Sequence, residues 1–132
     1  MEVIEGLSTW RRKFENSVVA LGTFDGVHRG HQEVIRTTRD IARRNGKTSV
    51  VVTFEPVPRA VIGEERKKIG LLTTLKQKEE LIGNLGIDAM LVIHFNRKLA
   101  RIDPEEFVNR VIYKRIGAGR VVVGPGFRFG KN

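Results

Sequence analysis

The chain has 132 residues, a formal net charge of +9 at pH 7 and no cysteine. This length is enough for one domain with a hydrophobic core, and the lack of cysteine excludes disulfides, thiolate metal sites and a thiol nucleophile. No apolar run approaches the roughly 20 residues needed to span a bilayer, and the N-terminus lacks the pattern of a secretory signal. We therefore expect a cytoplasmic protein with no membrane partner.

The positive charge favours an anionic partner, which can be a nucleotide, a nucleic acid or an anionic lipid. The alternative is a solvated basic surface. The basic clusters are short, and they fall in separate segments without interleaved aromatic residues, at Arg11–Lys13, Arg43–Arg44 and Arg66–Lys68. A stacking surface for single strands needs that interleaving, so nucleic acid is not the expected main partner.

The first predicted strand and the first predicted helix are separated by a glycine-rich turn. Val18–Leu21 is an all-apolar run, as in a strand buried on both faces. The segment Gly22–His31 follows it, and a helical pattern then runs from Gln32 to Asn45 and stops at Gly46. The first N–H groups of a helix are unpaired and carry partial positive charge, so this order of elements favours phosphate binding.

Three further β-rich runs predict buried strands at Thr48–Phe54, Ala89–Ile93 and Arg120–Val123. Between them lie two helical patterns. One opens with a Thr74/Gln77 capping box and continues to Gly86, and the other opens with Asp103-Pro104 and ends at Gly117. Strands that alternate with helices in this way predict an α/β fold with a mainly parallel sheet and flanking helices.

Ligands of such sheets bind outside the carboxyl ends of the strands. Three segments directly follow predicted strands, and we expect them to line one site: Gly22–His31, Glu55–Arg59 and Gly124–Asn132.

Two histidines, His28 and His31, stand at the predicted helix start with Arg29 and Gly30 between them. At this spacing the two imidazoles share one helix face, and their N–H groups can hold phosphates and stabilise charge on a leaving pyrophosphate. Two histidines placed there by chance are the alternative. Zinc is not expected, because the only other histidine is the distant His94, so we predict no metal held by the protein itself.

Four segments, in order, resemble the sequence blocks of one family: Gly22–His31 with its His-x-Gly-His signature, Thr53–Arg59, Leu72–Lys78 and Phe127–Gly130. The signature is that of the nucleotidyltransferase superfamily. In detail the chain resembles the N-terminal adenylyltransferase module of the prokaryotic bifunctional riboflavin kinase/FMN adenylyltransferases, from about Val3 to Asn132. The resemblance implies a Rossmann-like sheet of the nucleotidyltransferase type.

The resemblance also implies an activity, the transfer of AMP from ATP to FMN with Mg²⁺, giving FAD and pyrophosphate. It implies catalytic roles for His28 and His31. The residues it assigns to ATP are Gly22, Thr23, Phe24, Asp25, Gly26, His28, Gly30 and His31. The residues it assigns to the flavin are Phe54, Glu55, Pro56, Arg59, Phe127, Arg128 and Phe129.

The chain departs from the family pattern at two places: Val57 stands where the family usually has His, and Pro125-Gly126 stands where it usually has Asn or an acidic residue. The family module continues beyond the position of Asn132 and is followed by a riboflavin kinase domain. We therefore expect one adenylyltransferase-like domain over residues 1–132, lacking its C-terminal part and the kinase domain.

Three other functions remain open from the sequence. They are a nucleotide-binding module without turnover, a nucleotidyltransferase for another small phosphorylated or pantetheine-like acceptor, and a basic nucleic-acid binder. The sequence carries no signal for an oligomeric state.

Overall fold

The computed structural model describes residues 1–10, 14–24, 29–55 and 75–124. They contain a five-stranded sheet in the order β1-β4-β3-β2-β5, and every neighbouring pair is parallel. The strands are β1 (Glu2–Glu5), β2 (Ser17–Leu21), β3 (Ser49–Phe54), β4 (Ala89–Ile93) and β5 (Ala118–Val123). The predicted α/β class and the parallel sheet are confirmed.

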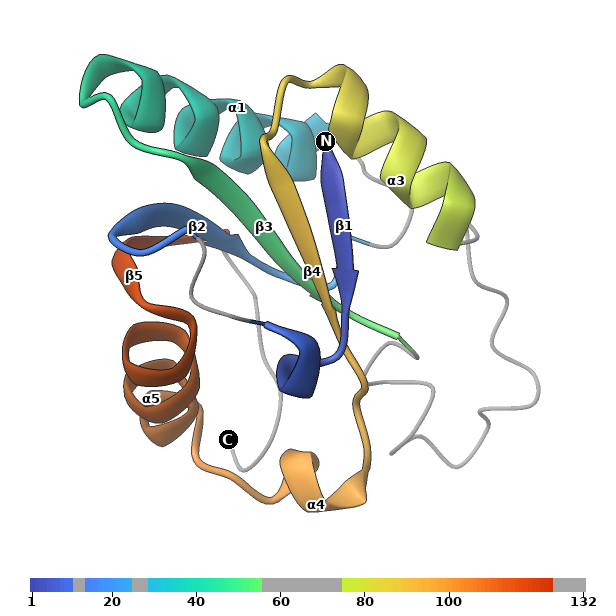
Figure 1. Cartoon of the computed structure of the whole chain (residues 1–132). Coiled ribbons are helices and arrows are strands. Elements are labelled where there is room, and N and C mark those ends of the chain that lie inside the picture. Colours follow the sequence, from blue (N-terminus) through green and yellow to red (C-terminus); the bar gives the residue numbers. More distant parts are fainter. Residues whose placement is uncertain (11–13, 25–28, 56–74, 125–132) are drawn as a thin grey trace.

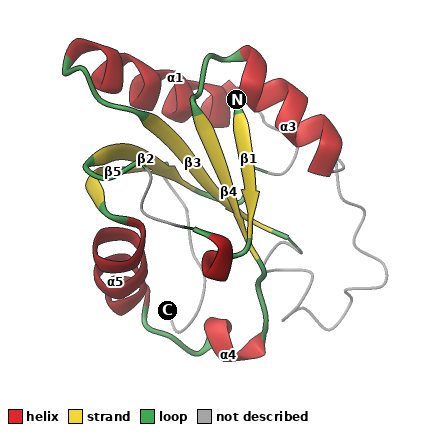
Figure 2. Cartoon of the chain, viewed as in Figure 1, coloured by secondary structure: helices red, strands yellow, loops and turns green. Residues whose placement is uncertain are grey.

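Helices cover both faces of this sheet (Figures 1 and 2). They are α1 (Arg29–Arg44), α3 (Leu75–Asn84), α4 (Arg97–Ala100), α5 (Pro104–Phe107), a π-helical continuation η2 (Val108–Ile116) and a short 3₁₀ turn η1 (Leu7–Thr9). Among the described residues no helix has the length and apolar character needed to cross a membrane.

The three central strands have no solvent-exposed face, because each residue of β2, β3 and β4 is buried. Successive side chains of a strand point to opposite faces, so each strand feeds two cores. Ala20, Val51 and Met90 pack under α1 and α3 with Ile35 and Ile82. On the opposite face, Leu21, Val52 and Leu91 pack with Trp10, Phe107 and Ile112.

Local signals fix the ends of the helices. Gly46, at φ +63°, follows α1, and the Lys47 N–H reaches back to the Ala42 carbonyl. Asp103 caps α5, because its carboxylate accepts from the Glu105 N–H at 2.9 Å, and Gly117 in the left-handed region ends η2. The predicted stops at Asn45-Gly46 and Gly117 and the predicted start at Asp103 are therefore confirmed.

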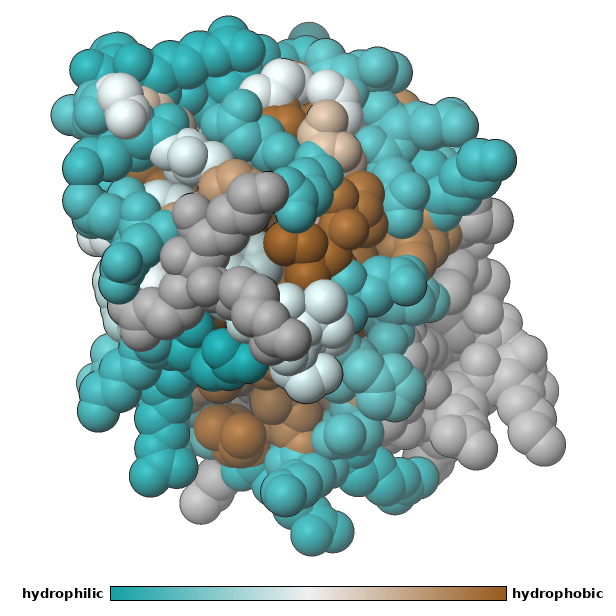
Figure 3. Space-filling view, viewed as in Figure 1, coloured by the Kyte–Doolittle hydropathy of each residue, from teal (hydrophilic) through white to brown (hydrophobic). Residues whose placement is uncertain are grey.

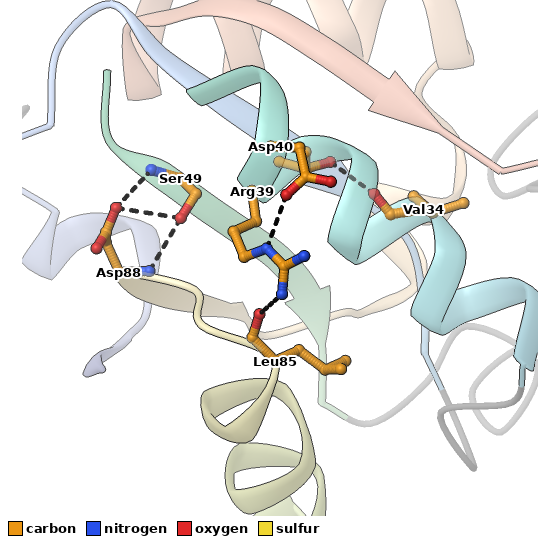
Figure 4. Close-up of polar contacts among 7 residues, drawn as sticks. Val34, Arg39, Asp40, Ser49, Leu85 and Asp88 are labelled. Atoms are coloured by element: carbon orange, nitrogen blue, oxygen red, sulfur yellow. Dashed lines mark hydrogen bonds and ion pairs between the residues drawn. The ribbon is translucent and has the colours of Figure 1, made fainter. Parts of the chain in front are cut away.

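Polar contacts tie the elements together at the amino ends of β3 and β4 (Figure 4). The Asp88 carboxylate accepts from both the backbone N–H and the hydroxyl of Ser49, at 2.9 and 3.1 Å. Arg39 of α1 donates to the Leu85 carbonyl at the end of α3, at 2.9 Å. These bonds lie at the edge of the sheet opposite the carboxyl ends of the strands.

The chain order reverses at β2. From β2 the chain passes through α1 to β3 and then through α3 to β4, whereas β5 pairs with the other side of β2 after α5 and η2 have packed on the opposite face. In open α/β sheets this reversal opens a crevice at the carboxyl ends of the two strands that flank it, here β2 and β5.

Most predicted elements agree with the structure within a few residues, but α1 begins at Arg29 rather than Gln32. Three described elements were not predicted: β1, η1 and α4. β1 has only two apolar residues between glutamates and is recognisable only through its pairing with β4. In Figure 3 an apolar patch lies over this edge strand, where Val3 and Ile4 are half-buried.

Trp10, which carried no signal in the sequence, is 1% exposed, and its indole N–H donates to the Ile116 carbonyl at 3.0 Å. This bond fixes the end of η2 to the N-terminal segment. We expect Trp10→Phe to lower the free energy of unfolding by about 1–3 kcal/mol, since it removes a buried donor and part of a core side chain.

Urea unfolding measures this loss, with Tyr113→Phe as the matched control. Tyr113 is 41% exposed, so its variant should stay within about 0.5 kcal/mol of the unmodified chain. Equal stabilities for the two variants would contradict the role given to the indole.

Candidate functional site

Three neighbouring strands deliver their following segments to one edge. Gly22, Glu55 and Gly124 directly follow β2, β3 and β5, which are adjacent in the order β3-β2-β5. The end of β5 also lies against α1, because a Cβ added to Gly124 would be 3.1 Å from Cγ2 of Val34. The first residues of the three segments thus follow adjacent strands at the same end of the sheet, and the lining of one site by the three segments stays a prediction.

The turn after β2 is tightly built. The Gly22 N–H donates to the Val52 carbonyl of β3 at 3.1 Å. Phe24 has φ +52°, a left-handed conformation that costs a residue with a side chain about 1–2 kcal/mol. Its buried ring lies over Gly22, where an added Cβ would be 2.8 Å from the ring carbon Cζ. Gly22 is therefore required for the space it leaves to Phe24.

The Thr23 carbonyl, inside this turn, accepts two hydrogen bonds from side chains. Thr53 of β3 donates its hydroxyl at 2.8 Å, and Lys78 of α3 donates from Nζ, also at 2.8 Å. Both side chains are buried, with Thr53 0% and Lys78 1% exposed. Neither residue was predicted to be part of the site, although both lie in segments that resemble the family blocks, Thr53–Arg59 and Leu72–Lys78. Lys78 also shares the inward face of α3 with Ile82, and a charged residue in such an apolar stripe is a second signal.

His31 lies in the first turn of α1 and is half-buried. Its ring meets the Phe24 ring edge-on, with centroids 5.5 Å apart and an interplanar angle of 84°. The first turn of α1 contains no acidic residue, and Arg29 and Gly30 are exposed beside it. The positive end of a 16-residue helix is therefore uncompensated by carboxylates of its own first turn.

Phe54 and Glu55, both predicted to face the flavin, have different surroundings. Phe54 is fully buried, and its ring packs against those of Phe95 and Phe107 at centroid distances of 5.6 and 6.1 Å. Glu55 is half-buried beyond the end of β3, and its N–H donates to the Ile93 carbonyl. Phe54 thus belongs to the hydrophobic core, whereas Glu55 lies at the carboxyl ends of the strands.

The remaining predicted site residues lie outside the described residues. They are Asp25, Gly26, His28, Pro56, Arg59, Phe127, Arg128 and Phe129. The structure therefore brings together Gly22, Thr23, Phe24, Gly30 and His31, and Glu55 and Gly124 directly follow the two flanking strands.

This arrangement suits an anionic, phosphate-bearing ligand. It has a helix N-terminus, an imidazole fixed against a buried ring, and a turn whose backbone is held by a lysine and a threonine. Within residues 1–10, 14–24, 29–55 and 75–124, no group of three or more His, Cys, Asp or Glu side chains is placed to hold a metal ion.

A sequence profile of the FAD synthetase family matches residues 11–132. The bifunctional riboflavin kinase/FMN adenylyltransferase of Bacillus subtilis is 40% identical over 115 residues, which are 87% of this chain and 36% of the relative. The enzyme of the same name from Pseudomonas fluorescens is 35% identical over 130 residues, which are 98% of this chain and 41% of the relative. The chain therefore spans well under half the length of these two relatives.

Two solved structures share the fold. One, described as a macrolide-efflux protein from Streptococcus pneumoniae, superposes with a TM-score of 0.85 at 26% identity, over 98% of this chain and 50% of that one. A pantothenate synthetase from Thermus thermophilus superposes with a TM-score of 0.53 at 21% identity, over 70% of this chain and 32% of that one. The second likeness concerns the fold alone.

The packing of Phe24 over Gly22 gives a direct test of the turn. We expect Gly22→Ala to lower the free energy of unfolding by about 1–3 kcal/mol, because the new methyl group displaces a buried ring. Gly30→Ala is the matched control. A Cβ there meets nothing within 4 Å. In a helix, Ala is favoured over Gly by about 0.5–1 kcal/mol.

Thermal or urea unfolding of both variants measures the difference. If Gly22→Ala is as stable as the unmodified chain, the ring does not occupy the space above Gly22 in solution.

Proposed function

This chain belongs to the FAD synthetase family, and we propose that it transfers the AMP group of ATP to FMN, giving FAD and pyrophosphate. The observation that carries the proposal is the turn at the reversal of chain order, which leads from β2 into the N-terminus of α1 with His31 packed on Phe24. Residues 1–132 are proposed to act as one adenylyltransferase module, since both cores form on a single sheet.

In the proposed reaction a phosphate oxygen of FMN attacks the α-phosphorus of ATP. The bond from that phosphorus to the oxygen bridging it to the β-phosphorus breaks, and pyrophosphate leaves. No side chain needs to act as a nucleophile, so the protein contributes position and charge stabilisation. The N-terminus of α1 and the imidazoles of His31 and His28 would stabilise the negative charge that grows on the leaving group.

ATP is proposed to lie against Gly22, Thr23, Phe24, Asp25, Gly26 and Gly30, along the turn and the start of α1. The flavin is proposed to lie beside it, between the segments that follow β3 and β5. Glu55, Pro56 and Arg59 would contact it from one side, and Phe127, Arg128 and Phe129 from the other. The strand order β3-β2-β5 supports this proposal, because Glu55 and Gly124, the first residues of those two segments, follow the strands on either side of β2. Phe54 would support the pocket from the core, since it is fully buried.

Mg²⁺ is proposed to arrive with ATP. The oxygens of the nucleotide phosphates would supply ligands to the ion. A cytoplasmic location is proposed because it is where ATP and FMN are available. The proposal concerns adenylyl transfer alone, and does not extend to the riboflavin kinase step in the relatives' name.

The test mixes the chain with ATP, Mg²⁺ and FMN and follows FAD and pyrophosphate. We expect both products in equal amounts, and a rate lower by about 100-fold or more for His31→Ala, since it removes a donor aimed at developing charge. His94→Ala is the matched control, because His94 is exposed and follows β4, which is not one of the three strands β3, β2 and β5 whose following segments form the proposed site. Its rate should stay within about twofold of the unmodified chain.

Three results would count against the proposal. If ATP and FMN bind but no FAD forms, the chain is a binding module without turnover. If a pantetheine-like phosphate is adenylylated and FMN is not, the acceptor is wrong. If His94→Ala loses as much rate as His31→Ala, the site is misplaced.

A further inference from the structure

Lys78 is the one charged residue among the buried residues of the described chain, at 1% exposure. It lies on α3 with Ile82, another residue that faces the core beneath that helix. Burying an ammonium group costs free energy unless hydrogen bonds replace its water. An aliphatic side chain would fill this position without that cost, so the packing of α3 alone does not account for the lysine.

The ammonium group of Lys78 forms hydrogen bonds to the turn after β2 and to β3. Nζ donates to the Thr23 carbonyl at 2.8 Å and has a longer contact of 3.5 Å with the Thr53 hydroxyl oxygen. The Thr53 hydroxyl donates to the same carbonyl. Residues from β3 and α3, far apart in sequence from the turn, therefore converge on one backbone oxygen.

Holding that oxygen orients the next residue. A peptide unit is planar and trans, so its N–H points opposite to its carbonyl. With the Thr23 carbonyl directed at Lys78 and Thr53, the Phe24 N–H is directed away from them. Phe24 itself is in a left-handed conformation, which persists only when its surroundings enforce it. Its ring then sets the position of the His31 ring, 5.5 Å away.

We propose that Lys78 is a positioning residue for adenylyl transfer: through the Thr23 carbonyl it fixes Phe24, and through Phe24 it fixes His31 for contact with the ATP phosphates. Thr53 is the second donor to the same carbonyl. The inference rests on the proposed function for its reaction, but the link from Lys78 to His31 is a property of the folded chain and can be measured without substrate.

The main variant is Lys78→Met, which keeps most of the length of the side chain and removes its donors. Lys76→Met is the matched control, because Lys76 is exposed on the same helix. Thr53→Val removes the other donor to the Thr23 carbonyl and retains a β-branched residue in β3. If Lys78→Met does not fold, Thr53→Val still tests whether the hydrogen bonds to the Thr23 carbonyl position His31.

Two measurements separate positioning from general stability. The first is the KM for ATP, which should rise about tenfold in Lys78→Met and in Thr53→Val while the KM for FMN stays within about twofold. Partial unfolding lowers the amount of active enzyme and changes neither KM. The second is the NMR spectrum of the His31 ring, assigned through His31→Ala. Its resonances should move in both variants and stay in place in Lys76→Met.

Unchanged His31 resonances in folded Lys78→Met and Thr53→Val would overturn the proposal. So would equal rises in the two KM values, or a shift of His31 in Lys76→Met as large as in Lys78→Met. If the unmodified chain makes no FAD, the adenylyl-transfer proposal fails on its own, and the His31 resonances still decide whether Lys78 positions the turn.

Discussion

The site depends on how one backbone carbonyl, that of Thr23, is held. A glycine-rich turn has many conformations, and the loss of that freedom must be offset by contacts. Here the offsetting contacts are two buried donors, Thr53 and Lys78, together with the packing of Phe24 over Gly22. They come from β3, from α3 and from within the turn. The turn is thus defined only when the sheet and the covering helix have formed around it.

The sheet positions the elements that hold this turn. Bonds between Ser49 and Asp88 and between Arg39 and Leu85 join its elements at the amino ends of the strands. At the carboxyl ends, the adjacent strands β3, β2 and β5 deliver their following segments to a common edge. At the amino ends of the strands, internal polar contacts join neighbouring elements. The carboxyl ends present the turn and the N-terminus of α1. That division agrees with the proposed phosphate site, which lies where the chain order reverses.

The sequence was sufficient for the elements whose pattern is local. An all-apolar run predicted β2 and β-rich runs predicted β3 and β4, and the Asp103-Pro104 start and the Gly46 and Gly117 stops followed from capping rules. β1 could not be predicted in this way, because two apolar residues between glutamates become a strand only beside β4. Trp10 was missed for the same reason, since its partner is the distant Ile116 carbonyl. For the proposed site, the location of His31 and Gly22 between a strand and a helix could be predicted from the sequence, whereas the contact of Lys78 with Thr23 forms only in the folded chain.

ATP is proposed to bind at the carboxyl ends of the strands, on the turn after β2. The most direct test is a titration of the ¹⁵N-labelled chain with ATP and Mg²⁺, followed by FMN, while the backbone amide resonances are recorded. We expect ATP to shift the amide resonances of Gly22, Phe24 and His31, and FMN then to shift those of Glu55 and Gly124, while those of Ser49 and Asp88 at the amino ends of the strands stay in place. Shifts concentrated at Ser49 and Asp88, or saturating ATP that leaves Gly22, Phe24 and His31 unmoved, would contradict this proposal.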